Sequence, residues 1–269
     1  MIYAQEGRTV TTFRGTQGPL SGTMSHILKG ASRSFEWYDV PIAAAYGLRS
    51  SIRPEYNNRL IVRPFHFEEE LQEHVGVSGR YSIGSMDKDL IPYSVFFAGL
   101  AYTAGADILT NANINDEDYQ RLFVFYKSLI YTHTATELVK NFTRKDRPDG
   151  TDGKSFFSGH SSTTFAAVSF IYREVDDFID RGTISRNSST KFLMKSLSFT
   201  ALYGWASFVA YSRLRDNKHY LMDVATGAAV GTLIGNMLYS KYFSSPSDSF
   251  NFSMGVSDNT PHLNFSYSF

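Results

Sequence analysis

The feature that most constrains the fold is a long apolar half in which hydrophobic residues recur with helical spacing. From Leu90 to Lys241 this spacing predicts five helices. They cover about 90–106, 117–142, 161–180, 190–212 and 220–242. Because several of these segments are apolar nearly all round, we expect them to pack against one another in the middle of a bundle. The fold class that follows is all-α.

Polar residues interrupt each apolar segment that approaches the length of a membrane span. LIPYSVFFAGLAYTAGAD ends in Asp107, LSFTALYGWASFVAYSR is threaded with serine and threonine, and the last segment contains Asp223 and Asn236. No window reaches 18 uninterrupted apolar residues. The pattern therefore favours buried helices of a water-soluble bundle over membrane-spanning helices.

The two ends of the chain differ in pattern from the bundle. Residues 1–34 are rich in glycine, threonine and serine, and RTVTTFRG predicts an isolated strand or ordered arm. FHFEEELQEHVG is typical of an acidic amphipathic helix that ends at Gly76. Near the C-terminus, FNFSMGV and LNFSYSF alternate on either side of the turn sequence SDNTP. We expect an irregular, partly helical N-terminal extension at 1–89, a helical bundle at 90–242 and a C-terminal β-hairpin at 243–269.

Charge and composition exclude several kinds of function. Lysine plus arginine equals aspartate plus glutamate at 26 each, so we expect no nucleic-acid partner. The chain has no cysteine, which excludes disulfides, a thiolate nucleophile and cysteine-based metal sites. His66 and His74 flank Glu70 but match no compact ligand cluster of a known type, so we interpret them as a solvated helix face and predict no metal.

The first of three polar clusters is KNFTRKDRP, where Lys140 ends a long helix and Arg147 precedes Pro148. The proline stops the helix and fixes the local backbone, so both cations project from a stiff turn. Basic residues at a helix C-terminus can also simply complement the helix dipole. By itself this cluster is compatible with both roles.

The second cluster is Ser158, Gly159 and His160, placed just before a helix that begins near Ser161. A helix N-terminus offers unpaired backbone N–H groups to an anion, and glycine allows a close approach. His160 would face the same space from the first turn. The alternative is an ordinary N-cap made by the serines that follow.

The third cluster is YSRLRDNKHYLMDV, which contains Arg213, His219 and Asp223. His219 and Asp223 are four residues apart at the start of a helix, so they share one face. Asp223 can then hold one imidazole nitrogen while the other points outward, as a nucleophilic or basic histidine requires. An ordinary ion pair at this spacing is the alternative.

Together, the spacings Lys-x6-Arg-Pro, Ser-Gly-His and Ser-Arg-x5-His-x3-Asp resemble the signature of the type 2 phosphatidic acid phosphatase (PAP2) superfamily. This superfamily includes class A bacterial acid phosphatases and vanadium haloperoxidases. The motifs cover Lys140 to Asp223, and the helix pattern extends the resemblance to Leu90–Lys241. One position departs from the family pattern, because Phe157 precedes Ser158 where the family usually has proline.

The resemblance implies a catalytic helical bundle of the PAP2/haloperoxidase type and a phosphatase that needs no metal or other cofactor. His219 would attack phosphorus to give a phosphohistidine, Asp223 would fix its tautomer, and His160 would protonate the leaving alcohol and later activate water. The phosphate-binding groups would be Lys140, Arg147, Ser158, Gly159 and Arg213. Four further cations near the motifs are interpreted as solvated charges or a rim: Arg144, Lys145, Arg215 and Lys218.

Two other functions and several substrates stay open at this stage. Vanadate bound to His219 would make the chain a haloperoxidase, although it is short for that branch. A phosphate-binding relic of weak activity is the other alternative, suggested by Phe157 and the unmatched ends. The substrate would be a phosphorylated small molecule or lipid: a lipid phosphate, an isoprenoid pyrophosphate or a small soluble ester.

The ends of the sequence bear on localisation. The start, MIYAQEGRTV, lacks the pattern of a signal peptide, which indicates a cytoplasmic protein or a mature form without its leader. The alternating Leu263, Phe265, Tyr267 and Phe269 resemble the last strand of bacterial outer-membrane proteins. Two strands cannot close a barrel, so the hairpin would pack on the bundle or on a neighbouring subunit. This favours the bacterial periplasm or envelope, with peripheral membrane contact and a homo-oligomer both open.

Overall fold

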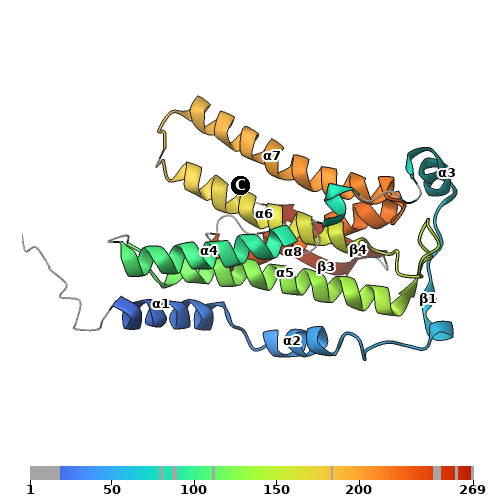
Figure 1. The fold of residues 1–269 in the computed structure, drawn as a ribbon, viewed down its shortest axis with the longest axis horizontal. Coiled ribbons are helices and arrows are strands. Elements are labelled where there is room, and N and C mark those ends of the chain that lie inside the picture. Colours follow the sequence, from blue (N-terminus) through green and yellow to red (C-terminus); the bar gives the residue numbers. More distant parts are fainter. Residues whose placement is uncertain are drawn as a thin grey trace, which may run out of the picture.

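The computed structural model describes residues 19–77, 79, 82–86, 90–110, 113–182 and 184–244, and the backbone of 250–257 and 260–267. The piece RTVTTFRG lies outside these residues. The described part is mostly helical, as predicted, and contains eight α-helices (Figure 1). They are α1 (Pro19–Ser34), α2 (Asp39–Leu48), α3 (His66–Val75), α4 (Leu90–Leu109), α5 (Asp116–Phe142), α6 (Gly159–Asp180), α7 (Ser188–Arg215) and α8 (Leu221–Phe243).

Helices α4 to α8 correspond to the five predicted segments and are confirmed to within a few residues at each end. Helix α5 lies along α4 and α6, and α6 and α7 form an antiparallel pair (Figure 1). The core between α5, α6 and α8 is largely aromatic: Phe125, Phe170 and Tyr239 are buried there, with Phe170 and Tyr239 in an edge-to-face contact at 5.2 Å between ring centroids. This core fixes the helix ends at which the polar motifs lie.

A row of three glycines on α8 faces α6. Gly227, Gly231 and Gly235 are spaced four residues apart, so they lie on one side of the helix. A Cβ atom at Gly231 would lie 2.0 Å from the carbonyl oxygen of Ser162, and one at Gly235 would lie 2.6 Å from that of Ala166. The two helices therefore approach more closely than any larger side chain would allow.

Helix α1 was not predicted from the glycine, threonine and serine content of residues 1–34. It packs on the first turns of α5, where a Cβ at Gly30 would lie 2.7 Å from the Cβ of Tyr119. Its other anchor is polar: His26 Nδ1 lies 3.0 Å from Asp107 Oδ2, which also accepts a hydrogen bond from the Tyr119 hydroxyl (3.3 Å). The first contact is a close approach of two helices at a glycine, and the second is a set of polar side chains. Hydrophobic periodicity in the sequence reveals neither kind of contact.

Two short sheets complete the described structure. Strand β1 (Leu60–Ile61) pairs in parallel with β2 (Thr143–Arg144), with Leu60 opposite Thr143. This pairing joins the N-terminal extension to the end of α5. Strands β3 (Phe250–Ser257) and β4 (Thr260–Tyr267) pair antiparallel, from Phe250 opposite Tyr267 to Ser257 opposite Thr260.

The outer surface of the bundle is more apolar than expected for a water-soluble protein. In α4 only Pro92, Phe96 and Asp107 are buried. Tyr102 of α4 and Phe192 of α7 are 78% and 73% exposed. These helices pack on their neighbours through one side only, so their apolar character on the other side is not explained by the core. Among the described helices, α8 is the one long and apolar enough by length and composition to cross a membrane.

Candidate active site

The three polar clusters of the sequence meet at one end of the bundle, where α5 and α7 end and α6 and α8 begin (Figure 1). The Ser158 N–H donates to the carbonyl oxygen of Asp223 at 3.0 Å, which joins the second cluster to the third. Arg147 Nη1 lies 3.3 Å from His219 Nε2, which joins the first to the third. The structure thus brings together groups as far as 72 residues apart in the chain.

His219 is the best-defined group of this site, and it is 1% exposed. Its Nδ1 lies 2.7 Å from the carbonyl oxygen of Ser155, which can only accept a hydrogen bond, so Nδ1 carries the proton. Its Nε2 faces Arg147 Nη1, which can only donate, so Nε2 carries a lone pair. The two partners select the neutral tautomer that has its nucleophilic nitrogen beside a guanidinium.

The charge environment of His219 favours the same neutral state. Burial, followed by the positive charges of Lys140 and Arg147, lowers the pKa of His219 to about 3 against the opposing effect of Asp223. The imidazole is therefore neutral across the physiological pH range. A lone pair on Nε2 is available without prior deprotonation.

Asp223 is fully buried, and its contacts differ in one respect from the prediction. The Asp223 Oδ2 atom lies 3.9 Å from His219 Nδ1, too far for a hydrogen bond, and the direct bond of Nδ1 goes to Ser155. Asp223 instead holds the surroundings of the imidazole: Oδ2 accepts from Ser155 Oγ (2.5 Å) and from the Tyr220 N–H (3.0 Å). The tautomer is fixed by a backbone carbonyl, and the carboxylate acts on His219 by charge.

Burial alone would raise the pKa of Asp223, but its interactions with His219, Lys145 and Ser155 outweigh that effect and lower the pKa. The carboxylate is therefore ionised beside the imidazole. A negative charge at this place can stabilise an imidazolium or a phosphorylated imidazole as positive charge develops on His219.

Lys145 was predicted to be a solvated charge or part of a rim, and this prediction is wrong. The side chain is 2% exposed, and its Nζ lies 2.7 Å from Asp223 Oδ1. The same Nζ lies 3.4 Å from both carboxylate oxygens of Glu68, which is 1% exposed. The reason is the extended segment after α5, which places Lys145 between Glu68 of α3 and Asp223 of α8.

Glu68 was also missed, because it belongs to the helix that was interpreted as a solvated face. His66, Glu70 and His74 are exposed, but Glu68 points the other way. Its Oε1 accepts from the Met222 N–H (2.9 Å) in the first turn of α8, one residue before Asp223. One signal was available: Glu68 and the buried Gln72 are spaced four residues apart, so both lie on the inner face of α3.

Helix α3 also supports the loop that carries His219. Gln72 Nε2 donates to the carbonyl oxygen of Leu214 (2.8 Å) and to Asn217 Oδ1 (2.7 Å). Asn217 has φ 57°, a left-handed conformation that asparagine tolerates well. The Ser82 hydroxyl donates to Asp216 Oδ2 at 2.8 Å. The N-terminal extension is thus part of the wall of the site.

The N-terminus of α6 has the predicted form. Ser158 is the N-cap residue, and its Oγ accepts from the Ser161 N–H at 3.4 Å. Gly159 is the first helical residue and is buried, and His160 follows it half-buried. Phe157, which stands at the family's proline position, is buried and has an edge-to-face contact with Phe156; the peptide bond between them is cis.

The predicted cations lie at the ends of α5 and α7. Lys140 and Arg213 are buried in the last turns of these helices, and Arg213 Nη1 lies 3.4 Å from Asp216 Oδ2. Arg147 Nε pairs with Asp152 Oδ1 (2.7 Å), and its Nη1 donates to the Lys218 carbonyl oxygen (3.1 Å). Lys218, predicted to be a solvated charge or part of a rim, is partly exposed and pairs with Asp149.

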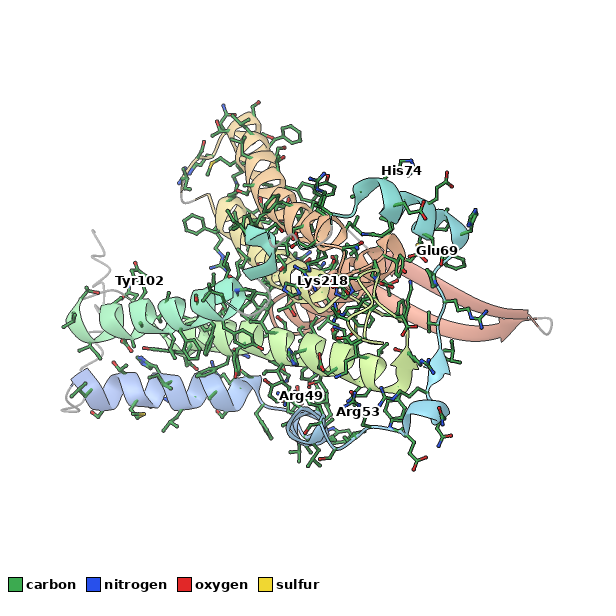
Figure 2. The ribbon with its side chains drawn as sticks, turned by 45° about the vertical axis from the view of Figure 1, so that its right-hand side comes forward. Arg49, Arg53, Glu69, His74, Tyr102 and Lys218 are labelled. Atoms are coloured by element: carbon green, nitrogen blue, oxygen red, sulfur yellow. The ribbon has the colours of Figure 1, made fainter. Side chains whose placement is uncertain are left out.

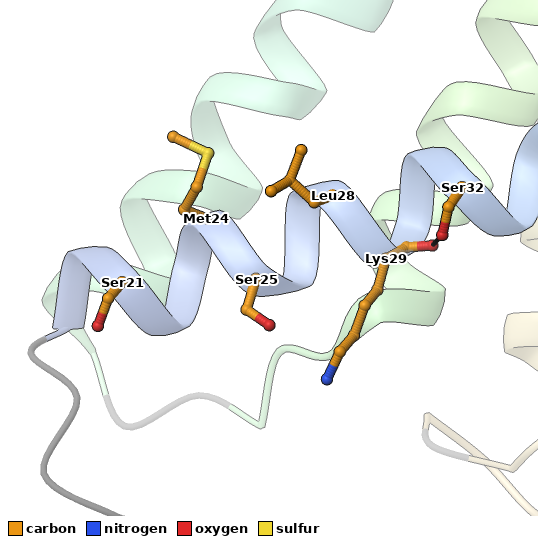
Figure 3. Close-up of a pocket in the computed structure, with 6 residues that line it drawn as sticks. All are labelled: Ser21, Met24, Ser25, Leu28, Lys29 and Ser32. Carbon is orange, nitrogen blue, oxygen red and sulfur yellow. Dashed lines mark hydrogen bonds between the residues drawn. The ribbon is translucent and has the colours of Figure 1, made fainter.

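Two hollows lie away from the polar clusters, and their linings differ from each other. A shallow one of about 540 Å³ lies along the outer face of α1, where Met24, Leu28 and Lys29 project from the helix (Figure 3). It is at the other end of α5 from the polar clusters. A groove of about 560 Å³ between α2 and α5 is lined mostly by apolar side chains such as Val40, Tyr46 and Ile130. Among the described residues, no three acidic or histidine side chains gather as a metal-ligand cluster.

Comparison with known proteins finds similarity over the same segment. The PAP2 superfamily matches residues 124–246. The chain is 38% identical over 93 residues to the lipid A 1-phosphatase of Porphyromonas gingivalis, covering 35% of this chain and 17% of that protein. It is 28% identical over 86 residues to diacylglycerol pyrophosphate phosphatase 1 of Saccharomyces cerevisiae, covering 32% of this chain and 28% of that protein.

The chain therefore spans less than a third of the length of these curated relatives. Among solved structures, it is similar to a transmembrane PAP2-type phosphatidylglycerolphosphate phosphatase of Bacillus subtilis. That similarity has a TM-score of 0.39 at 16% identity and covers 83% of this chain and 94% of the other.

Proposed function

We propose that this chain, which matches the PAP2 superfamily over residues 124–246, hydrolyses phosphate monoesters carried by lipids, through a phosphohistidine and without a metal. The observation that carries this proposal is the state of His219. Its Nδ1 proton is held by Ser155, and its Nε2 lone pair lies beside Arg147. A neutral histidine placed in this way is a nucleophile next to a group that binds phosphoryl oxygens.

In the first step, His219 Nε2 would form a bond to phosphorus while the bond from phosphorus to the ester oxygen breaks. His160 would give its proton to that oxygen, so the alcohol leaves neutral. Lys140, Arg147 and Arg213 would neutralise the phosphoryl oxygens, together with the N-terminal N–H groups of α6. The phosphorylated imidazole would be stabilised by the ionised Asp223.

In the second step, His160 would take a proton from water, and the resulting hydroxide would displace His219 from phosphorus. His219 returns to its neutral form, and His160 regains the proton that it gave away in the first step. In both steps, the charges that develop are stabilised by side chains and N–H groups of this chain. We further propose that residues 90–242 form the catalytic unit and that α3 completes it.

Three observations support a lipid substrate. The relatives are named for lipid A and for diacylglycerol pyrophosphate. The groove between α2 and α5 offers an apolar lining on the same helix that carries Lys140 in its last turn. Large exposed apolar surfaces mark sites of contact with other molecules or with a membrane, and α4 and α7 have such surfaces. A position at the membrane of the bacterial envelope fits these features.

The test is hydrolysis of phosphatidic acid in detergent micelles and of p-nitrophenyl phosphate, each with and without a chelator. We expect phosphate release that the chelator does not reduce. His219→Ala should lower kcat by about 10³-fold or more, because it removes the nucleophile. His74→Ala is the matched control, since His74 is an exposed histidine outside the site.

A chemical quench with a ³²P-labelled substrate should trap a phosphoenzyme that is stable in base and labile in acid, and His219→Ala should abolish it. Full activity of His219→Ala would overturn the assignment of the nucleophile. The absence of hydrolysis of any ester by the unchanged protein would overturn the proposed function.

A further inference from the structure

A small basic pocket lies beside the proposed phosphate site. It has a volume of about 230 Å³ and is formed by the segment after α2, the last turns of α5 and the loop before α6. Its lining is Arg49, Ser50, Arg53, Glu137, Asn141 and Lys154. Arg49 and Arg53 lie near each other below α5 (Figure 2). Three cations face one carboxylate, so the pocket has an excess of positive charge.

Hydrogen bonds tie this pocket to the proposed catalytic groups. Asn141 directly follows Lys140, and its Nδ2 donates to the carbonyl oxygens of Arg49 (2.5 Å) and Ile52 (3.1 Å). Since Asn141 is buried, it holds the segment after α2 at a fixed place against α5. The position of Arg49 and Arg53 relative to Lys140 is therefore set by the fold.

The opposite wall is connected just as closely. Lys154 directly precedes Ser155, whose carbonyl oxygen holds His219 Nδ1. The Lys154 N–H donates to Asp152 Oδ1 (2.8 Å), the same oxygen that pairs with Arg147 Nε (2.7 Å). Both walls of the pocket are thus one residue away from a group of the proposed site.

The cations of the pocket are available to a ligand. Within the part of the chain that the structure describes, no carboxylate pairs with Arg49, Arg53 or Lys154. The guanidinium of Arg49 lies over the ring of Tyr46 at 4.3 Å and donates to the Tyr46 carbonyl oxygen, which orients its remaining N–H groups. An arginine held in this way loses little entropy on binding an anion.

We propose that this pocket binds a second phosphate of the substrate, in addition to the phosphate that is hydrolysed. This inference rests on the proposed phosphatase function. Arginine and lysine side chains are the usual partners of phosphate oxygens. The volume fits one small group and is below the roughly 300 Å³ at which pockets for whole drug-sized ligands begin. The second phosphate can come from a diphosphate or from a separate position on the headgroup.

The test compares three lipids that each carry a terminal phosphoryl group; the leaving group is an alcohol in the monoesters and phosphatidic acid in the diphosphate. They are phosphatidic acid, diacylglycerol pyrophosphate and a lipid with two separate monoester phosphates. For each enzyme, the readout is the ratio of kcat/KM for each two-phosphate lipid to that for phosphatidic acid. Because this is a ratio within one preparation, a partly unfolded variant does not change it.

Arg53→Gln and Lys154→Gln should each lower this ratio by about tenfold, the loss expected for one charge-assisted contact. Arg186→Gln is the matched control, because it removes the same charge from an exposed loop residue between α6 and α7. A fall for the diphosphate alone assigns the pocket to the adjacent phosphate, and a fall for the other lipid alone assigns it to a remote one.

Unchanged ratios in both variants, with an active enzyme, would overturn the second-phosphate pocket and leave the proposed function standing. No hydrolysis of any of the three lipids by the unchanged enzyme would overturn the proposed function instead.

Discussion

At the scale of single residues, the motifs were readable from the sequence, but the charge network behind them was not. His219, Asp223 and Arg147 have fixed spacings, and the structure brings them together. Lys145 stands in the charged run RKDR and Glu68 in the run EEE, so each looks like its solvated neighbours. Which member of such a run turns inward depends on the contacts of α3 and α8, and these are tertiary.

The buried pair of Glu68 and Lys145 leads to a prediction for Glu68→Gln. The amide keeps an oxygen for the Met222 N–H but removes the negative charge next to Lys145. Breaking a buried ion pair by removing one partner costs about 3–5 kcal/mol. Because glutamine keeps the shape and one hydrogen bond, we expect the free energy of unfolding to fall by about 2–3 kcal/mol.

We also expect kcat to fall by about tenfold with little change in KM, because Lys145 would then interact with Asp223 alone and weaken its effect on His219. Chemical denaturation and steady-state kinetics measure the two effects. Glu69→Gln is the matched control, since Glu69 is exposed on the same helix. Equal behaviour of the two variants would contradict a positioning role for Glu68.

At the scale of elements, hydrophobic periodicity predicted the helices of the bundle but not the distances between them. The segment that became α8 was recognised by its apolar content, whereas the three glycines facing α6 had no assigned role. Their spacing of four residues is visible in the sequence, but only the structure shows backbone carbonyls of α6 against them. This close approach sets the separation between Ser158 at the start of α6 and Asp223 at the start of α8.

Gly231→Ala tests this contact. The added Cβ would lie 2.0 Å from the Ser162 carbonyl oxygen, a backbone atom that cannot move aside without shifting α6. Overpacking of this kind costs about 1–3 kcal/mol of stability, and we expect at least that loss in a thermal or chemical denaturation. Because the shift separates the N-termini of α6 and α8, kcat/KM should fall as well.

The control for this change is Gly204→Ala on α7, where a Cβ would meet no atom within 4 Å. In a helix interior that change should stabilise by about 0.5–1 kcal/mol. A Gly231→Ala protein that is as stable as the Gly204→Ala protein would show that the helices can separate at no cost.

At the scale of the whole molecule, the sequence patterns did not reveal which apolar side chains lie on the surface. Polar residues in each apolar segment favoured a water-soluble bundle, yet large apolar side chains remain exposed on α4 and α7. Two of the interruptions lie at inner contacts: Asp107 of α4 contacts His26 and Tyr119, and Asp223 of α8 lies in the site. A count of uninterrupted residues cannot separate a polar residue on an inner face from one on an outer face.

This surface predicts how the protein binds to a membrane. The formal net charge is zero, so attraction to anionic lipid is weak and apolar contact must dominate. We expect the protein to cosediment with neutral phosphatidylcholine vesicles as well as with anionic ones, and to remain bound at 1 M salt, where charge interactions are screened. Leu193→Ser combined with Leu197→Ser removes two exposed leucines of α7 and should weaken this binding about tenfold or more.

Thr200→Ser, also exposed on α7, is the control for the leucine variant and should bind vesicles normally. Binding that needs anionic lipid and is lost at high salt would contradict the apolar mode, because it would point to the basic residues near the site instead. Binding of the leucine variant at the unchanged level would move the contact away from α7, toward α4 or the α2–α5 groove. Since the proposed substrate is held in the same membrane, hydrolysis of phosphatidic acid in vesicles should fall with vesicle affinity, while hydrolysis of p-nitrophenyl phosphate should not.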